Sequence, residues 1–170
     1  MKPIVSNATP LIYLAKIGRL TLLKDIFGEV LIPNEVKKEV VDRGKELGEK
    51  DAYHIDKAIQ DGWIIVRQAE IVDTPIKLHK GEASTLSLAK RTGQSEVLID
   101  EVSARTAARL MSLTPRGTVY VLLKALEMKL INLNEFHTAL SDLVESGFRL
   151  KEEVYLEAIR KAREIDQPHT

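Results

Sequence analysis

Short apolar runs alternate along the chain with longer segments of helical periodicity. The apolar runs lie at about 3–6, 30–32, 63–66 and 96–99, and none of them alternates regularly with polar residues. Helices are predicted at about 10–17, 19–27, 34–43, 50–61, 82–91, 101–111, 118–129, 133–145 and 150–164. Continuous apolar strands separated by helices are typical of a parallel sheet that is buried on both faces. The pattern predicts an α/β fold with Ile4–Ser6 as a central strand and Val97–Ile99 beside it.

The segments between these elements are predicted to be loops. Residues 44–50 are rich in glycine and charge, residues 67–79 are irregular, and residues 114–118 form a polar elbow that leads into a helix. The chain has no internal repeat and no Gly/Ser linker. With 170 residues it is expected to form a single domain over 1–170, in which about 132–170 is a helical C-terminal extension packed on the rest.

Composition excludes several kinds of protein. The chain has no cysteine, so it has neither a disulfide framework nor a thiolate metal site, which fits a cytoplasmic location. Its apolar runs are far shorter than the roughly 18 residues of a membrane span. The 25 basic residues balance the 25 acidic ones, so any contact with nucleic acid must come from a local basic patch.

Polar or acidic residues recur where the predicted strands end. Asn7 and Asp100-Glu101 follow apolar strands directly, Glu82 opens a helix, and Glu39 lies on the helix after the second strand. Carboxyl ends of parallel strands share one edge of a sheet, and ligand sites of α/β proteins lie at that edge. Hard cations such as Mg²⁺ and Mn²⁺ prefer oxygen ligands, and such clusters hydrolyse phosphate esters. These residues therefore predict a divalent-cation site.

Each acidic residue also has an ordinary structural explanation. Glu39 has the spacing of a surface helix pair with Arg43, and Glu82 is placed to favour a helix dipole. Asp100 can cap the helix 101–111. Under this alternative the chain is a general α/β protein whose acids are caps and surface pairs. Convergence of the acids in space distinguishes the two interpretations.

Other residues suggest substrate contacts rather than a different chemistry. Arg105 and Arg109 are four residues apart on one helix, as in a phosphate-facing stripe, with ordinary solvated arginines as the alternative. Ser6 and Thr9 flank Asn7 but have no partner base that would make either a nucleophile. The sequence contains no nucleotide-binding glycine motif, and its four histidines show no metal-ligand spacing.

The residues at these positions resemble those of PIN-domain proteins, and most closely a little-characterised prokaryotic branch of them. The resemblance rests on five short blocks in order: Ile4-Val5-Ser6-Asn7-Ala8-Thr9-Pro10-Leu11-Ile12, Leu31-Ile32-Pro33 with Val36 and Glu39, Lys80-Gly81-Glu82-Ala83, Leu98-Ile99-Asp100-Glu101 with Ala104-Arg105, and Gly117-Thr118 with Val121-Leu122-Leu123. It extends to Gly147-Phe148-Arg149-Leu150 and so covers nearly the whole chain.

The resemblance implies a three-layer α/β/α sandwich with a central parallel sheet. It also implies a Mg²⁺- or Mn²⁺-dependent endoribonuclease of single-stranded RNA, often the toxin of a toxin–antitoxin pair. Carried over by position, Glu39, Glu82 and Asp100, or its neighbour Glu101, become metal ligands, with Thr118 nearby.

The chain departs from the PIN pattern at Asn7, where the family usually has Asp. An amide oxygen still ligates a cation but brings no negative charge, so metal binding should be weaker. The alternative function is a catalytically weakened module that binds RNA or a protein without cleavage. The apolar component of the last helix further predicts a homo-oligomer, such as a homodimer, or a small antitoxin-like partner.

Overall fold

The fold is described from a computed structural model, in which residues 1–168 are placed. Residues 169–170, the end of the predicted domain, lie outside the described part. Among residues 1–168, five strands form one parallel sheet in the order β3-β2-β1-β4-β5. The strands are β1 (Ile4–Ser6), β2 (Val30–Pro33), β3 (Ile64–Arg67), β4 (Glu96–Leu98) and β5 (Thr114–Arg116). The predicted parallel sheet with a central first strand is confirmed.

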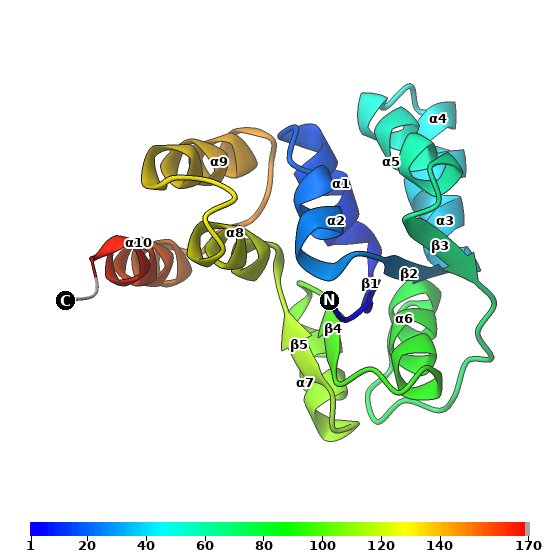
Figure 1. The fold of residues 1–170 in the computed structure, drawn as a ribbon. Helices are drawn as coiled ribbons and strands as arrows, with labels where there is room; N and C mark the ends of the chain where they lie inside the picture. Colours follow the sequence, from blue (N-terminus) through cyan, green and yellow to red (C-terminus); the bar gives the residue numbers. More distant parts are fainter. Residues whose placement is uncertain (169–170) are drawn as a thin grey trace.

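Helices follow the strands in the alternating order that the sequence predicted (Figure 1). They are α1 (Ala8–Lys16), α2 (Thr21–Phe27), α3 (Asn34–Lys37), the π-helix η1 (Lys38–Arg43), α4 (Gly44–Glu46), α5 (Lys50–Gln60), α6 (Lys80–Arg91), α7 (Val102–Leu110), α8 (Thr118–Glu127), α9 (Leu133–Glu145) and α10 (Glu152–Asp166). In this described region no helix has the length and apolar character needed to cross a bilayer.

The sheet has an apolar core on each face. Ile4, Ile32 and Leu98 point into one core, which α1, α2, α5 and α8 close. Val5 and Val97 belong to the second core, which α6 and α7 close. Because side chains alternate along a strand, successive positions of the central strands β1, β2 and β4 point to one or the other of these cores. Continuous apolar runs are therefore required, and the result is an α/β/α arrangement (Figure 1).

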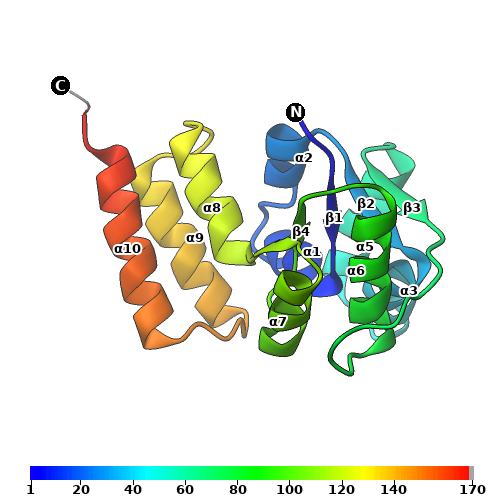
Figure 2. The same cartoon turned by 90° about the horizontal axis from the view of Figure 1, so that it is seen from below.

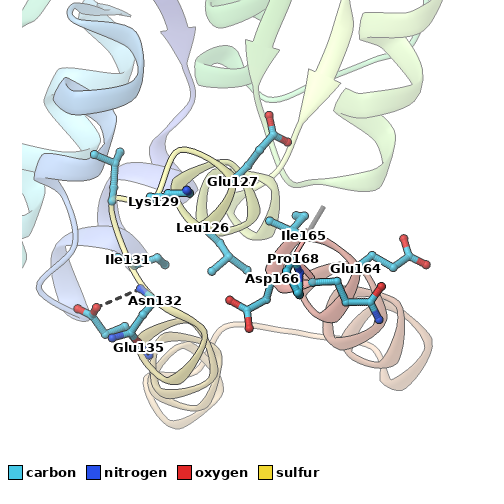
Figure 3. A pocket seen from close by; sticks show the side chains of 12 residues that line it. Leu126, Glu127, Lys129, Ile131, Asn132, Glu135, Glu164, Ile165, Asp166 and Pro168 are labelled. Carbon is cyan, nitrogen blue, oxygen red and sulfur yellow. Dashed lines mark hydrogen bonds between the residues drawn. The ribbon is translucent and has the colours of Figure 1, made fainter. Parts of the chain in front are cut away.

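The C-terminal helices extend the larger core away from the sheet. Helices α8, α9 and α10 lie side by side (Figure 2). Helix α10 packs through Ala158 and Ala162, which are fully buried, whereas Leu156 is 58% exposed. An open groove of about 770 Å³ lies between the ends of these helices, with Leu126 and Ile165 among the side chains that line it (Figure 3).

Two predicted loops contain regular structure. Residues 44–46 continue the helical run that starts at Asn34, where a loop was expected from Gly44. Residues 114–116 form the edge strand β5, where only an elbow was expected. Helix α1 also begins at Ala8 rather than Pro10.

Candidate functional site

Five of the predicted site residues lie at the carboxyl-terminal edge of the sheet. Asn7 directly follows β1, and Asp100 and Glu101 follow β4. Glu82 lies in the first turn of α6, and Glu39 lies in η1, in the helical run after β2. Four different elements thus bring the candidate side chains to one edge, as parallel strands with helical crossovers require.

Asn7 and Glu101 are joined directly. The Asn7 amide Nδ2 donates to Glu101 Oε2 at 3.2 Å, and the Thr9 hydroxyl donates to Glu101 Oε1 at 2.7 Å. Asn7 itself is only 4% exposed. The Thr85 hydroxyl lies 3.4 Å from Asn7 Oδ1, but it is only 2.7 Å from the Gly81 carbonyl, which is the better acceptor. Asn7 Oδ1 is therefore a buried acceptor with only a long contact.

Glu39 and Glu82 lie close enough to other carboxylates to be perturbed by them. Burial raises the pKa of Glu39, and the negative charges of Glu101 and Glu82 raise it further. Burial also raises the pKa of Glu82, against the hydrogen bond that the His79 backbone N–H donates to it, and Glu101 adds repulsion. Three carboxylates from separate elements thus repel one another across this edge.

Glu39 is not consumed by a surface ion pair. In the described chain no salt bridge joins Glu39 to Arg43. The charge of Arg43 lowers the pKa of Glu39, but it does not offset the rise caused by burial and by the neighbouring carboxylates. Its Oε2 atom lies 3.6 Å from the position that a Cβ at Gly81 would occupy. The ordinary explanation of Glu39 as a surface pair is therefore not what the structure shows.

Asp100 has a different position from Glu101. Its two carboxylate oxygens accept from Thr118, Oδ1 from the backbone N–H at 2.9 Å and Oδ2 from the hydroxyl at 2.7 Å. Burial raises the pKa of Asp100, although both hydrogen bonds from Thr118 oppose the rise. The expectation that Asp100 caps the helix 101–111 is wrong. It binds the first residue of α8 instead, and Glu101 occupies the N-cap position of α7.

The residues predicted to contact substrate differ in their exposure to solvent. Arg105 donates to the Ile99 carbonyl at 3.1 Å and is half-buried, and this burial, together with the charge of Arg109, lowers its pKa. Arg109 is exposed on the same helix. Ser6 is completely buried and its hydroxyl donates to the Asn7 carbonyl, so it has no surface with which to meet a substrate.

A family model described as a PIN domain matches residues 3–164 of the chain. The chain belongs to the PIN-domain family. No curated protein and no solved structure matches it. The resemblance noted in the sequence is therefore confirmed at the level of the family, and membership indicates a nuclease. PIN domains generally depend on divalent metal ions.

The side chains at this edge of the PIN domain are of the type that binds a divalent cation, but they do not form a complete coordination site. Within residues 1–168, no three His, Cys, Asp or Glu side chains are arranged to hold a metal ion. The donor set is nevertheless all oxygen, it carries mutually repelling carboxylates, and it includes the poorly satisfied Asn7 Oδ1. Hard cations select such donors, and a cation would relieve the repulsion. Glu39, Glu82, Glu101 and the Asn7 oxygen are therefore the candidate donors for such a cation.

The roles of two residues at the PIN site were not found from the sequence. Thr85, one helical turn beyond Gly81, places its hydroxyl beside the Asn7 amide. Gly117 leaves room for Asp100, because a Cβ there would lie 2.7 Å from Asp100 Oδ1. Neither has a local signal, since Thr85 looks like an ordinary inward helical residue and Gly117 like a turn glycine.

Proposed function

We propose that this PIN domain is a divalent-metal-dependent endoribonuclease that cleaves single-stranded RNA. One observation carries the proposal: the carboxylates of Glu39, Glu82 and Glu101 come from three different elements and meet at the edge where α/β folds place their chemistry. The charge of Glu101 raises the pKa of both Glu39 and Glu82 there, and that of Glu82 raises the pKa of Glu39. Glu82 also caps α6 by accepting from the His79 backbone N–H, but a cap role alone does not explain why Glu82 lies beside Glu39 and Glu101. Family membership independently favours a nuclease.

The side chains then have separable roles. Glu39, Glu82 and Glu101 would hold Mg²⁺ or Mn²⁺ together with the Asn7 amide oxygen. Thr9 orients Glu101 through its 2.7 Å hydrogen bond. Asp100 accepts from Thr118 with both carboxylate oxygens and so fixes the start of α8, which favours Glu101 over Asp100 as the ligand from this pair. A bound cation would supply Lewis-acid activation of water and neutralise charge on the phosphodiester.

Cleavage of a labelled single-stranded RNA with and without Mn²⁺ tests this proposal. Glu82→Gln keeps the size of the side chain but removes a site charge, and it should reduce the rate by at least about 100-fold. Glu29→Gln is the matched control, because Glu29 is an exposed acid just before β2, at the opposite edge of the sheet. Equal activity of the two variants, or cleavage that is unaffected by chelator, would refute the proposal.

A second candidate function is a PIN module that binds RNA or a protein without cleaving RNA. The hydrogen bond from Asn7 to Glu101 favours it, because the amide already satisfies a carboxylate that a cation would otherwise hold. This candidate predicts RNA binding without Mn²⁺-dependent cleavage. The same RNA assay, run beside a binding measurement, separates the two functions.

We also propose that the apolar surface of α10 supports association with another chain. Val154, Tyr155 and Leu156 are 47%, 40% and 58% exposed. Such a surface suits a second copy of the protein or an antitoxin-like partner. For the substrate, exposed Arg109 is the better of the two arginines to meet a phosphate, since Arg105 is engaged with the backbone.

A further inference from the structure

The helical run that carries Glu39 is not a regular α-helix. Residues Lys38–Arg43 form a π-helix between α3 and α4, and the three pieces run without a break from Asn34 to Glu46. Such wide turns arise when one extra residue is accommodated in an α-helix, and they occur frequently at functional sites. Glu39 lies in the first turn of this π-helix.

A side-chain contact independently marks the wide turn. Lys37 Nζ lies 2.7 Å from Asp42 Oδ1, and the two residues are five positions apart. At about 100° per residue, positions five apart in an α-helix differ by about 140° around the axis and do not face each other. The ion pair therefore fits the wider π-turn, in which residues five apart lie on the same side, and it lies on the partly exposed side of the helix.

Packing is consistent with the extra residue as well. Val36, Val40 and Val41 are all buried to 2% exposure or less, which brings positions 36 and 41 to the core from one helix. Further along, a Cβ at Gly44 would lie 2.7 Å from the Ala52 Cβ, so α4 is pressed directly against α5. The two ends of the run are thus fixed by separate contacts, and Glu39 lies between them.

We infer that Lys37, Asp42 and Gly44 are positioning residues that hold the π-turn and thereby direct the Glu39 carboxylate to the other site carboxylates. The inference rests on the proposed function for its metal readout. An α-helical path would turn the downstream half by about 100° relative to α3. Either Glu39 or the buried valines would then lose their place. The wide turn satisfies both requirements at once.

Calorimetric titration with Mn²⁺ tests the ion pair with a matched control. Asp42→Asn removes the pair at the π-turn, and Asp61→Asn removes the Lys57–Asp61 pair at the C-terminal end of α5. Both aspartates have 48% exposed side chains. Asp42→Asn should weaken Mn²⁺ binding about two- to five-fold, as expected for an exposed pair, and Asp61→Asn should leave it unchanged. Equal affinity in the two variants would overturn the inference.

Substitution at the contact between Gly44 and Ala52 gives a stronger perturbation, which a second substitution can reverse. Gly44→Ala should weaken Mn²⁺ binding at least about five-fold, because the new methyl group must displace the helix. Ala52→Gly in the same chain removes the opposing Cβ and should restore binding to within about two-fold of the original protein. A Gly44→Ala protein that loses thermal stability but binds Mn²⁺ normally would show that the contact is only structural.

A metal-free measurement separates failure of this inference from failure of the proposed function. The coupling between Glu39→Gln and Glu82→Gln, measured by denaturation, reports the repulsion between the two carboxylates. The coupling should be present in the original protein and reduced when Asp42→Asn is added. If the original protein binds no Mn²⁺, the proposed function fails, and this cycle alone decides the inference. An unchanged coupling would show that the π-turn does not position Glu39.

Discussion

The substitution Asn7→Asp restores the residue that PIN domains usually have at this position. In the present protein the Asn7 amide donates to Glu101 at 3.2 Å, from a site that is only 4% exposed. The substitution replaces this donor with a second carboxylate oxygen at nearly the same place. A hydrogen bond is thus exchanged for a repulsion, with almost no change in volume.

The size of the effect follows from two limits. Unit charges about 3.2–4 Å apart repel by about 4–5 kcal/mol at an effective dielectric constant of about 20. The two carboxylates at positions 7 and 101 can also relieve their repulsion by taking up one proton. At pH 7 this protonation costs about 4 kcal/mol for an ordinary carboxyl group, so it sets an upper limit on the destabilisation. A shared proton also restores a hydrogen bond. Without metal, Asn7→Asp should therefore lower the free energy of unfolding by about 2–4 kcal/mol, or Tm by roughly 5–15 °C.

The assay is thermal unfolding with increasing Mn²⁺, beside calorimetric titration. A cation that binds only the folded protein adds about 2.7 kcal/mol at 100 times its Kd, which is enough to cancel most of the loss. The variant should bind Mn²⁺ more tightly than the original protein and should cleave single-stranded RNA faster. Addition of Glu82→Gln should abolish that cleavage.

Asn132→Asp is the control for an added charge far from the site. Asn132 caps α9 by accepting from the Glu135 backbone N–H, a role that a carboxylate also fills. This control should show no gain in Mn²⁺ affinity. If Asn7→Asp also shows none, and is as stable as the original protein without metal, the proposed proximity of residue 7 to a cation site is wrong.

Three further outcomes follow from the same contacts. The folded-state pKa values of Glu39 and Glu82 are raised, so their contribution to stability is present below the ordinary glutamate pKa of about 4.3 and is lost as the pH rises through the raised values. The metal-free protein should therefore lose stability from about pH 4 upward. In denaturation curves measured against pH, Glu82→Gln should reduce this loss. Gly117→Ala, at φ −99°, is free of backbone strain but crowds Asp100 Oδ1, and it should cost about 1–3 kcal/mol by chemical denaturation; an unchanged midpoint would contradict the close contact. Leu156→Lys should reduce the association state seen by light scattering without lowering Tm, and an unchanged mass would argue against association through α10.

The sheet was predictable because its central strands β1, β2 and β4 are buried on both faces and β3 is an apolar run beside them. That rule failed only for β5, whose sequence Thr114-Pro115-Arg116 contains one apolar residue, a proline. β5 is an edge strand that pairs with β4 alone, so the proline does not interrupt a ladder on a second side. The arginine of this strand is held by an ion pair with Glu96 across the same ladder. Edge strands are thus stabilised by contacts that a hydrophobic pattern does not record.

At position 44 the error was the opposite one, because a loop was predicted where the chain is helical. A glycine near charged residues predicts a turn, yet Gly44 has helical φ and ψ angles of −60° and −42°. Its role is to leave space for Ala52, and sequence spacing does not reveal a contact between two helices. The π-turn has the same origin, because it reconciles packing at two ends of one helical run. A helix of suitable length was predicted there, but its register depends on residues that are remote in sequence.

The convergence of acids at one edge was predictable from the strand ends, but the choice between Asp100 and Glu101 was not. After a strand ends, consecutive side chains point to different surroundings. Asp100 meets Thr118 at the end of the neighbouring β5, the strand that the sequence did not reveal, whereas Glu101 meets Asn7 and Thr9 beyond β1. Because the shorter acid is buried as the anchor of α8 and the longer one stays among the other carboxylates, exchanging the two residues would not preserve the site. Their ligand roles stay predictions, but the geometry already assigns the two adjacent charges to different partners.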